Sequence, residues 1–136
     1  MASDKIHLKV ITHEKIIYEN DIDELYVKTT DGSMGILKNH VPIIATLGIG
    51  VTKVVVDKTC ECITTMGGIL QFANNQATIL TDIAELECDI DVARARHAKE
   101  RAEARMKAHD ETLDITRAQM ALAKAIARIS TKEKRF

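Results

Sequence analysis

The sequence predicts an α+β fold, with an N-terminal antiparallel β-sandwich of about ten strands followed by a C-terminal two-helix antiparallel hairpin. Short alternating apolar and polar segments, separated by turn residues, fill the first two thirds of the 136 residues. From Asp91 onward Ala, Arg, Lys, Glu and Met dominate, and all are strong helix formers. All 6 Gly and the 1 Pro lie at or before Gly68. We therefore expect a sandwich domain over residues 1–88 and a helical hairpin over residues 89–136.

The predicted strands follow one another at close spacing. Ile6–Val10 alternates apolar and polar side chains, which is the period of a half-buried strand. Asp31-Gly32 is a common turn pair, and Asp57–Thr59 has the composition of a hairpin loop. Many short strands joined by such turns are typical of a sandwich or a flattened barrel. Strands are expected over residues 6–10, 15–18, 24–28, 35–37, 51–56, 61–65, 69–73 and 77–80, with one more beginning at Pro42.

The composition of the second region predicts two helices, each of about 18 residues and roughly 27 Å long. Asp89 or Asp91 can cap the first helix, because a side-chain oxygen there accepts a hydrogen bond from a free backbone N–H. Residues 109–112 interrupt the helical composition, and Thr112 or Asp114 can cap the second helix. The result is a helical hairpin with a short connection.

Apolar side chains recur at helical spacing in both predicted helices. Burying a large side chain stabilises by about 1.5–3 kcal/mol, whereas one CH₂ group is worth only about 0.8 kcal/mol. A hairpin lined mostly by alanine therefore gains little by packing, and we expect it to be able to open. The first stripe is Val92, Ala95, Ala98, Ala102 and Met106, and the second is Ile115, Ala118, Leu122, Ala125 and Ile129.

The net charge of −1 conceals an asymmetry between the two regions. Residues 1–88 carry seven Lys and twelve acids, a net of −5, whereas residues 89–136 carry five Lys, seven Arg and eight acids, a net of +4. A basic hairpin that binds nucleic acid is therefore one alternative. The excess of charge is modest, however, aromatic residues make up only 3%, and no groove-reading motif is present.

Catalytic and membrane signatures are missing from the sequence. It contains no GxxxxGK[ST], GxSxG or HExxH motif, and its 5 histidines lack the spacing of metal ligands. No apolar run approaches the roughly 20 residues of a membrane span, and the first residues lack a signal-peptide core. Three cysteines, an odd number, suit a reducing compartment. We expect a non-catalytic protein with no metal site and no required cofactor, one that is not itself inserted in a membrane.

Two rows of charged residues lie along the predicted helices at helical spacing. If these rows meet, their cations converge and can hold an anion such as phosphate, which suits arginine forks. The alternative is that both rows are solvated and pair with acids such as Glu100 and Glu103. The first row is Asp91, Arg94, Ala98, Arg101 and Arg105, and the second is Arg117, Ala121, Lys124 and Arg128.

Motifs along the whole chain resemble the epsilon subunit of F-type ATP synthases. Residues 31–44 (DGSMGILKNHVPII) resemble the family signature GxxGILxxHxPL. Residues 67–72 (GGILQF) and 75–82 (NQATILTD), followed by Ala84 and Glu85, resemble its second conserved stretch. Residues 90–95 (IDVARA) resemble its helix-opening motif, and KERAE at 99–103 and ALAKA at 121–125 also fit.

The resemblance implies a ten-strand sandwich and a helical hairpin at the foot of the rotating central stalk. In this family the sandwich binds the gamma subunit and contacts the c-ring, so that ring rotation is coupled to ATP synthesis and ion transport. Ser33 and His40 stand at positions similar to the ring contact. Ser33 replaces an acidic residue of some members, which puts a salt bridge to the ring in doubt. The expected location is the cytoplasmic face of the bacterial membrane, held peripherally by partners.

The resemblance also implies a mobile hairpin that blocks ATP hydrolysis when it extends into the alpha/beta catalytic head. Arg105, Arg117 and Lys124 are basic residues suited to acidic surfaces of that head. Some members bind regulatory ATP in the folded hairpin. Lys124 stands where tight binders can carry Arg, and the lysine lacks the bidentate fork of arginine. The matching nucleotide positions are Glu85, Ile90, Asp91, Arg94, Ala95, Arg101 and Arg128.

Overall fold

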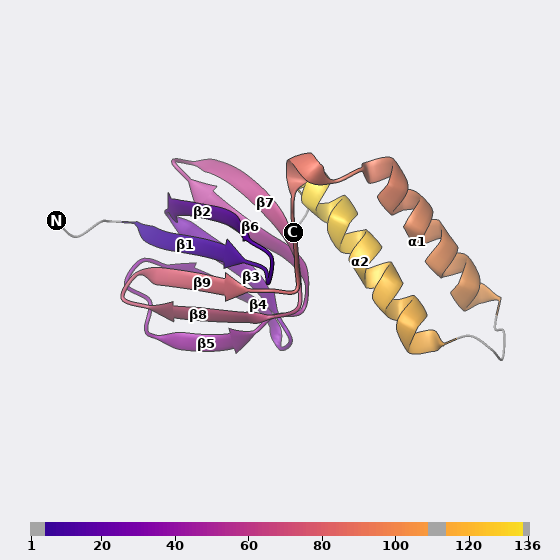
Figure 1. The fold of residues 1–136 in the computed structure, drawn as a ribbon, viewed down its shortest axis with the longest axis horizontal. Coiled ribbons are helices and arrows are strands. Elements are labelled where there is room, and N and C mark those ends of the chain that lie inside the picture. Colours follow the sequence, from indigo (N-terminus) through magenta and orange to yellow (C-terminus); the bar gives the residue numbers. More distant parts are fainter. Residues whose placement is uncertain (1–4, 109–113, 135–136) are drawn as a thin grey trace.

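The computed structural model describes residues 5–108 and 114–134. Within them the chain forms ten strands, one short 3₁₀ helix and two α-helices (Figure 1). The strands fill the first region and the α-helices the second, as predicted. The strands are β1 (Ile6–Ile11), β2 (Ile16–Ile22), β3 (Glu24–Thr29), β4 (Gly32–Leu37), β5 (Ile43–Thr46), β6 (Ile49–Val56), β7 (Thr59–Met66), β8 (Ile69–Ala73), β9 (Gln76–Leu80) and β10 (Ile83–Leu86).

Two five-stranded sheets form the sandwich. One has the order β2-β1-β9-β8-β5 and the other the order β10-β7-β6-β3-β4. Every pair of strands is antiparallel except β1 and β9, which run parallel, with Leu8 opposite Ala77 and Val10 opposite Ile79. The antiparallel sandwich expected from the sequence is therefore confirmed with one exception, which joins the first strand to the ninth.

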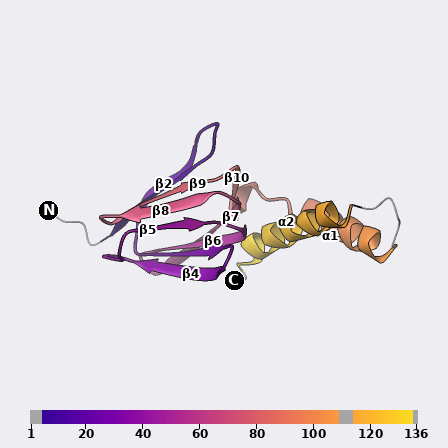
Figure 2. The ribbon, with the colours of Figure 1, turned by 90° about the horizontal axis from the view of Figure 1, so that it is seen from below.

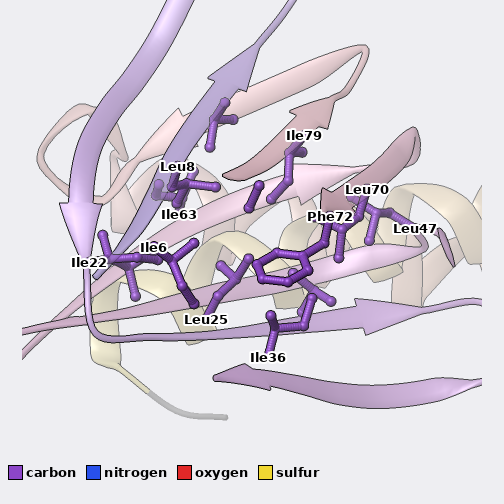
Figure 3. Close-up of a cluster of buried hydrophobic side chains, with 14 residues drawn as sticks. Ile6, Leu8, Ile22, Leu25, Ile36, Leu47, Ile63, Leu70, Phe72 and Ile79 are labelled. Atoms are coloured by element: carbon purple, nitrogen blue, oxygen red, sulfur yellow. The ribbon is translucent and has the colours of Figure 1, made fainter. Parts of the chain in front are cut away.

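The sandwich core lies between the two sheets (Figure 3). It exists because alternate residues of each strand point inward, as in β1, whose burial alternates along its six residues. Large aliphatic side chains fill the space, and Phe72 is the aromatic ring among them, at 2% exposure. The completely buried members are Ile6, Leu8, Val10, Ile22, Leu25, Ile36, Val54, Leu70 and Ile79.

Tight turns with left-handed residues close two hairpins of the sandwich. Asp57 and Lys58 (φ 48° and 67°) join β6 to β7, and Asn74 and Asn75 (φ 52° and 57°) join β8 to β9. Two consecutive residues with positive φ match the twist of the flanking strands. The loop predicted at Asp57–Thr59 is therefore a two-residue turn.

Three expectations about the strands need correction. The strand expected at 15–18 continues to Ile22, because β2 is an edge strand whose polar residues still pair with β1. Strand β10 was not expected, since four residues carry little alternation. Strand β4 begins at Gly32 and not at Gly35, so Ser33, in the segment expected to form a turn, lies within a strand. The Tyr26 ring covers Gly35 so closely that a β-carbon there would lie 2.9 Å from the ring.

The hairpin consists of α1 (Val92–Lys107) and α2 (Ile115–Glu133), and the 3₁₀ helix η1 (Glu87–Asp89) links it to the sandwich. Asp91 caps α1 by accepting a hydrogen bond from the N–H of Arg94, and Asp114 caps α2 in the same way with Arg117. Of the two cap candidates considered for each helix, Asp91 and Asp114 hold these positions. The predicted interruption at 109–112, including Thr112, lies outside the described residues.

Both apolar stripes pack as expected, apart from one residue. Ala95, Ala102, Ala118 and Ala125 are buried between the helices. Ile115, expected at the start of the second stripe, is 59% exposed, because it opens α2 at the end far from the sandwich. No helix of the described residues is both long and apolar enough to span a membrane.

The hairpin stands beside the sandwich and projects away from it, as two perpendicular views show (Figures 1 and 2). The last turns of α2 pack on β6 and β7, and α1 packs on α2. The end of α1 and the beginning of α2 lie farthest from the sheets. Since α2 is the main support, a small number of its side chains decide whether the hairpin stays docked.

Candidate functional site

A cleft of about 410 Å³ lies where the hairpin meets the edge of the sandwich. Such a volume falls in the range of small-molecule sites, about 300–1,000 Å³. Strand β10, η1 and both α-helices contribute side chains, so the cleft exists in this form only while the hairpin is docked. The residues that line it are Glu85, Asp89, Asp91, Arg94, Ala95, Ala98, Arg101 and Arg128.

The local structure explains how three arginines reach one cleft. Arg94 and Arg101 are seven residues apart on α1, about two turns, so they lie on one face of that helix. Arg128 comes from α2, three quarters of the way along it. The predicted convergence of the two charged rows therefore occurs at one end of the rows, next to β10 and η1.

Arg128 is held by a bidentate ion pair with Glu85 of β10. Its Nε lies 3.1 Å from Oε1 and 3.0 Å from Oε2, and its Nη2 lies 2.7 Å from Oε1. Both side chains are partly covered, with 32% and 26% of their surfaces exposed. Because Arg128 belongs to α2 and Glu85 to the sandwich, this pair is also a clamp between the two regions.

The other two arginines are exposed, and the structure shows no carboxylate within ion-pair distance of them among the described residues. Asp91 accepts the backbone N–H of Arg94 at 3.1 Å, so its carboxylate stays at the N-terminus of α1. The cleft combines arginine forks, which match phosphate oxygens, with three carboxylates, which accept hydrogen bonds from amino groups. It is suited to a ligand that carries an anionic part and a donor part.

Six of the seven predicted nucleotide residues line this cleft. The exception is Ile90, which is 6% exposed and is not among the lining side chains. Asp89 and Ala98 line the cleft but were considered only as a cap candidate and as helix-face residues. Helical spacing could have indicated Ala98, which lies one turn before Arg101, whereas the position of Asp89 depends on the turn of η1.

The three residues predicted to contact a catalytic head lie elsewhere on the hairpin. Arg105 is exposed in the last turn of α1, and Arg117 is exposed in the first turn of α2. Lys124 is half-buried in the middle of α2. None of the three lines the cleft. Arg105 and Arg117 instead mark the end of the hairpin that lies away from the sandwich.

The two residues predicted to contact a c-ring are not brought together. Ser33 is the second residue of β4 and pairs with Lys28 of β3, whereas His40 follows the other end of β4. His40 makes a hydrogen bond from Nδ1 to the carbonyl of Val41, at 2.7 Å. Its ring meets the Phe72 ring edge-on, with the centroids 5.8 Å apart. A surface that includes both residues must run the length of this edge strand.

Polar contacts besides the Glu85–Arg128 pair pin the end of α2 to the sandwich. The Thr64 hydroxyl donates to the Thr131 hydroxyl at 2.7 Å, and Thr131 donates in turn to the carbonyl of Ala127 at 2.8 Å. Both threonines are completely buried. Lys132 donates to the carbonyl of Glu87 at 3.0 Å, at the junction with η1. Hydrogen bonds thus take a large share in a contact that has few large apolar side chains.

Cys62, which lies near this contact, is poorly suited to thiolate chemistry. Cys62 lies on β7, and burial, followed by the neighbouring Cys60, raises the pKa of its thiol to about 12. The two sulfur atoms are 4.0 Å apart on one face of β7, because residues two apart on a strand point to the same side. A thiol with so high a pKa is protonated at neutral pH and is therefore a weak nucleophile.

Comparisons with known proteins agree with this architecture. Residues 5–87 match the family model of the ATP synthase delta/epsilon chain β-sandwich domain, and residues 89–133 match that of its long α-helix domain. The chain is 41% identical to an ATP synthase epsilon chain of Halalkalibacterium halodurans, over 91% of this chain and 94% of that protein. It is also 41% identical to one of Syntrophomonas wolfei, over 98% of both chains.

A solved structure shares the fold. A chain in the cryo-EM structure of the mitochondrial ATP synthase of Euglena gracilis superposes with a TM-score of 0.80 and 22% identity, covering 93% of this chain and 81% of that one. Two family models together span most of the chain, and bacterial relatives match it nearly end to end. The chain belongs to the family of ATP synthase delta/epsilon chains, and the relatives it matches are epsilon chains.

Proposed function

We propose that the chain is a non-catalytic subunit of the central stalk of a bacterial ATP synthase, which binds the gamma subunit and the c-ring through its sandwich. The family membership supports this role, and the structural relatives come from assemblies described as OSCP/F1/c-ring and as central stalk/c-ring. Such a subunit sits peripherally, at the cytoplasmic face of the membrane. The matches give no support to the nucleic-acid alternative.

The cleft between the hairpin and β10 carries the regulatory part of this proposal. ATP binds there with its phosphates on Arg94, Arg101 and Arg128, which belong to two helices, while Glu85 belongs to the sandwich. One ligand therefore holds α1, α2 and β10 together. When ATP leaves, the hairpin undocks and extends toward the alpha/beta head, where Arg105, Arg117 and Lys124 meet acidic surfaces and hydrolysis stops.

The energetic scale of the switch fits this mechanism. A ligand present at about 100 times its dissociation constant stabilises the binding state by about 2.7 kcal/mol. The hairpin rests on alanine contacts and a few hydrogen bonds, so the docked and undocked states differ by a comparable amount. Lys124 does not line the cleft, so it adds no further cation to the three arginines there. ATP acts as a regulatory ligand and not as a required cofactor.

Hydrogen exchange of the isolated full chain tests the nucleotide site. ATP is expected to slow exchange of α2 amides in the wild type, and Arg94→Ala or Arg101→Ala is expected to weaken ATP binding by at least about tenfold, since each removes a charge-assisted contact. Lys107→Ala is the matched control, because Lys107 is an exposed cation on α1 outside the cleft. If ATP leaves α2 exchange unchanged in the wild type, the nucleotide switch is wrong.

Addition of the chain to a catalytic head depleted of this subunit tests the regulatory role. We expect the full chain to slow ATP hydrolysis, and a chain truncated after Cys88 to bind without slowing it, because the complete sandwich core lies before that residue. Circular dichroism of the truncated chain verifies that its strands are intact. If both chains bind and neither slows hydrolysis, the subunit serves coupling alone.

The ring contacts remain part of the proposal, with Ser33 and His40 at the two ends of β4. Substitution of each by cysteine, followed by cross-linking in the assembled enzyme, distinguishes a contact that spans the edge strand from one confined to one end. Cross-links to the ring from both positions would support a contact along the whole strand. Cross-links from one position alone would remove the other residue from the interface.

A further inference from the structure

A second hollow lies on the other flank of α2 from the nucleotide cleft. It has a volume of about 530 Å³ and is formed by α2 together with β3, β4 and β6 of the sheet on which α2 rests. Ile126 lines this hollow and Arg128 lines the cleft. At 3.6 residues per turn, side chains two residues apart on a helix point in directions about 160° apart. The two sites are therefore separated by the helix itself.

Apolar side chains from both regions of the molecule face each other across this groove. Ile126 of α2 is 43% exposed and Tyr26 of β3 is 37% exposed, although both are large apolar side chains. Val51 of β6 also lines the groove and is half-buried. Apolar side chains of α2 and of the sheet therefore line one groove.

The groove also carries positive charge. The stem of Lys28 lies flat against Gly50, where a β-carbon would come within 2.8 Å of it. Lys53 holds its Nζ 5.3 Å from the centroid of the Tyr26 ring. No aspartate or glutamate is among the described residues that line the groove. A groove lined by apolar side chains and by two lysines is complementary to an anion that has a hydrocarbon body.

We propose that this groove binds a small organic anion with an apolar body, of the medium-chain carboxylate class. The carboxylate lies by Lys28 and Lys53, and the hydrocarbon chain covers Val51 and Ile126. Because one wall belongs to α2 and the others to the sheet, the guest binds only the docked hairpin. It therefore favours the docked state by the same linkage as a nucleotide, but from the opposite flank and without using any arginine of the cleft.

A third hollow provides an internal comparison. It has a volume of about 700 Å³ and lies on the other sheet, against Pro42 and Phe72. None of its described lining residues is a lysine or an arginine. A probe that is attracted by apolar surface alone has no reason to prefer the groove beside α2 to this hollow, whereas an amphipathic anion does.

Titration of the isotope-labelled full chain with octanoate, followed by NMR, tests the proposal. We expect saturable shifts of the amides of Val51 and Ile126, and slower hydrogen exchange in α2. Acetate has the charge without the chain and is expected to cause neither effect. Octanol has the chain without the charge and is expected to bind about tenfold more weakly. Shifts that do not saturate, that centre on Phe72, or that octanol reproduces with equal affinity would overturn the proposal.

Three variants test where the carboxylate binds. Val51→Glu introduces an acid into the groove and is expected to weaken octanoate binding by at least about tenfold. Lys28→Gln, on the exposed rim, is expected to weaken it about fivefold and keeps the test valid if Val51→Glu fails to fold. Gln71→Glu places the same acid in the Phe72 hollow and is expected to leave octanoate affinity unchanged. Equal affinity in Lys28→Gln and wild type would contradict the carboxylate's proposed place.

Discussion

The sandwich and the hairpin are closed by different kinds of contact. Between the sheets, whole leucine, isoleucine and valine side chains are removed from water. Between α1 and α2, and between α2 and the sheet, the buried groups are mainly alanines and the hydroxyls of Thr64 and Thr131. A buried Leu or Ile is worth about 1.5–3 kcal/mol and a methyl group about 0.8 kcal/mol, so the two regions differ severalfold per residue buried.

This difference implies two separate stabilities in one chain. The sandwich is expected to unfold only in the global transition, whereas the hairpin can undock at a cost well below that of global unfolding. A regulatory element requires such a separation, because a ligand can only redistribute states that lie within a few kcal/mol of each other.

The largest effect is expected from a cavity in the sandwich. Ile36→Ala removes a completely buried side chain of β4 and should lower the free energy of unfolding by about 3–4 kcal/mol, measured by urea denaturation. Leu37→Ala, one residue along and 51% exposed, is the control and should change it by less than about 0.5 kcal/mol. Similar costs for the two variants would mean that this strand does not bury alternate side chains.

The hairpin contact should respond to the loss of one hydroxyl. Thr131→Val leaves the Thr64 hydroxyl without its acceptor and should lower the free energy of undocking by about 1–2 kcal/mol. The larger undocked population should be seen as faster hydrogen exchange in α2. The urea transition of the sandwich should stay in place. Thr116→Val, an exposed position on α2, is the control.

Removal of both hydroxyls sharpens this test. In Thr64→Val/Thr131→Val neither partner is left unsatisfied, so the docking free energy should recover most of the loss. A double variant that undocks further than Thr131→Val would show that packing of the threonines, and not their hydrogen bond, holds α2.

A turn of the sandwich should gain stability. Lys58 has a φ of 67°, a conformation that costs a residue with a side chain about 1 kcal/mol. Lys58→Gly should therefore raise the free energy of unfolding by about 0.5 kcal/mol, since part of the relief is offset by greater freedom of the unfolded chain. Thr59→Gly, the next residue and within β7, should instead destabilise the protein.

A further small effect concerns the pH dependence of stability. Hydrogen bonds first with Asp21 and then with Glu19 raise the pKa of His7 above its ordinary value. A raised pKa in the folded state gives stability that is complete below about pH 6.5 and is lost as pH rises through the folded pKa. Because the ring is 42% exposed, the loss should be under about 1 kcal/mol.

Urea midpoints at pH 6 and pH 8.5 measure this loss. His7→Gln should flatten the difference between the two midpoints, whereas His13→Gln, in the adjacent exposed turn, should not. A pH dependence that persists in His7→Gln would assign it to another group.

The fold class, the position of the helices and most of the strand starts could be predicted from the sequence. Alternation in Ile6–Val10 and the alanine spacing in α1 depend on local periodicity, which a sequence displays directly. The polar extension of β2 was missed because its support comes from β1 across the ladder. The exposure of Ile115 was missed for a similar reason, since helical spacing does not show where the partner helix ends.

The candidate site was predictable in its composition but not in its geometry. Motif resemblance and helical spacing identified Arg94, Arg101 and Arg128, and the structure brings them to one cleft. Neither signal could indicate that Arg128 is already paired with both carboxylate oxygens of Glu85, because the two residues are 43 positions apart. The groove beside Ile126 could not be predicted at all, since its walls come from distant parts of the chain.

The parallel pairing of β1 with β9 determines the order in which the molecule is completed during synthesis. Strand β1 is the second strand of its sheet and needs β9 as a neighbour, yet residues 76–80 leave the ribosome long after residues 6–11. Contacts so distant in sequence are slow to form, and an early strand waits with one open edge. Once β9 emerges, every strand of this sheet has been made, and β10 and the hairpin follow. The hairpin is thus added after the sheet that holds β1 is complete.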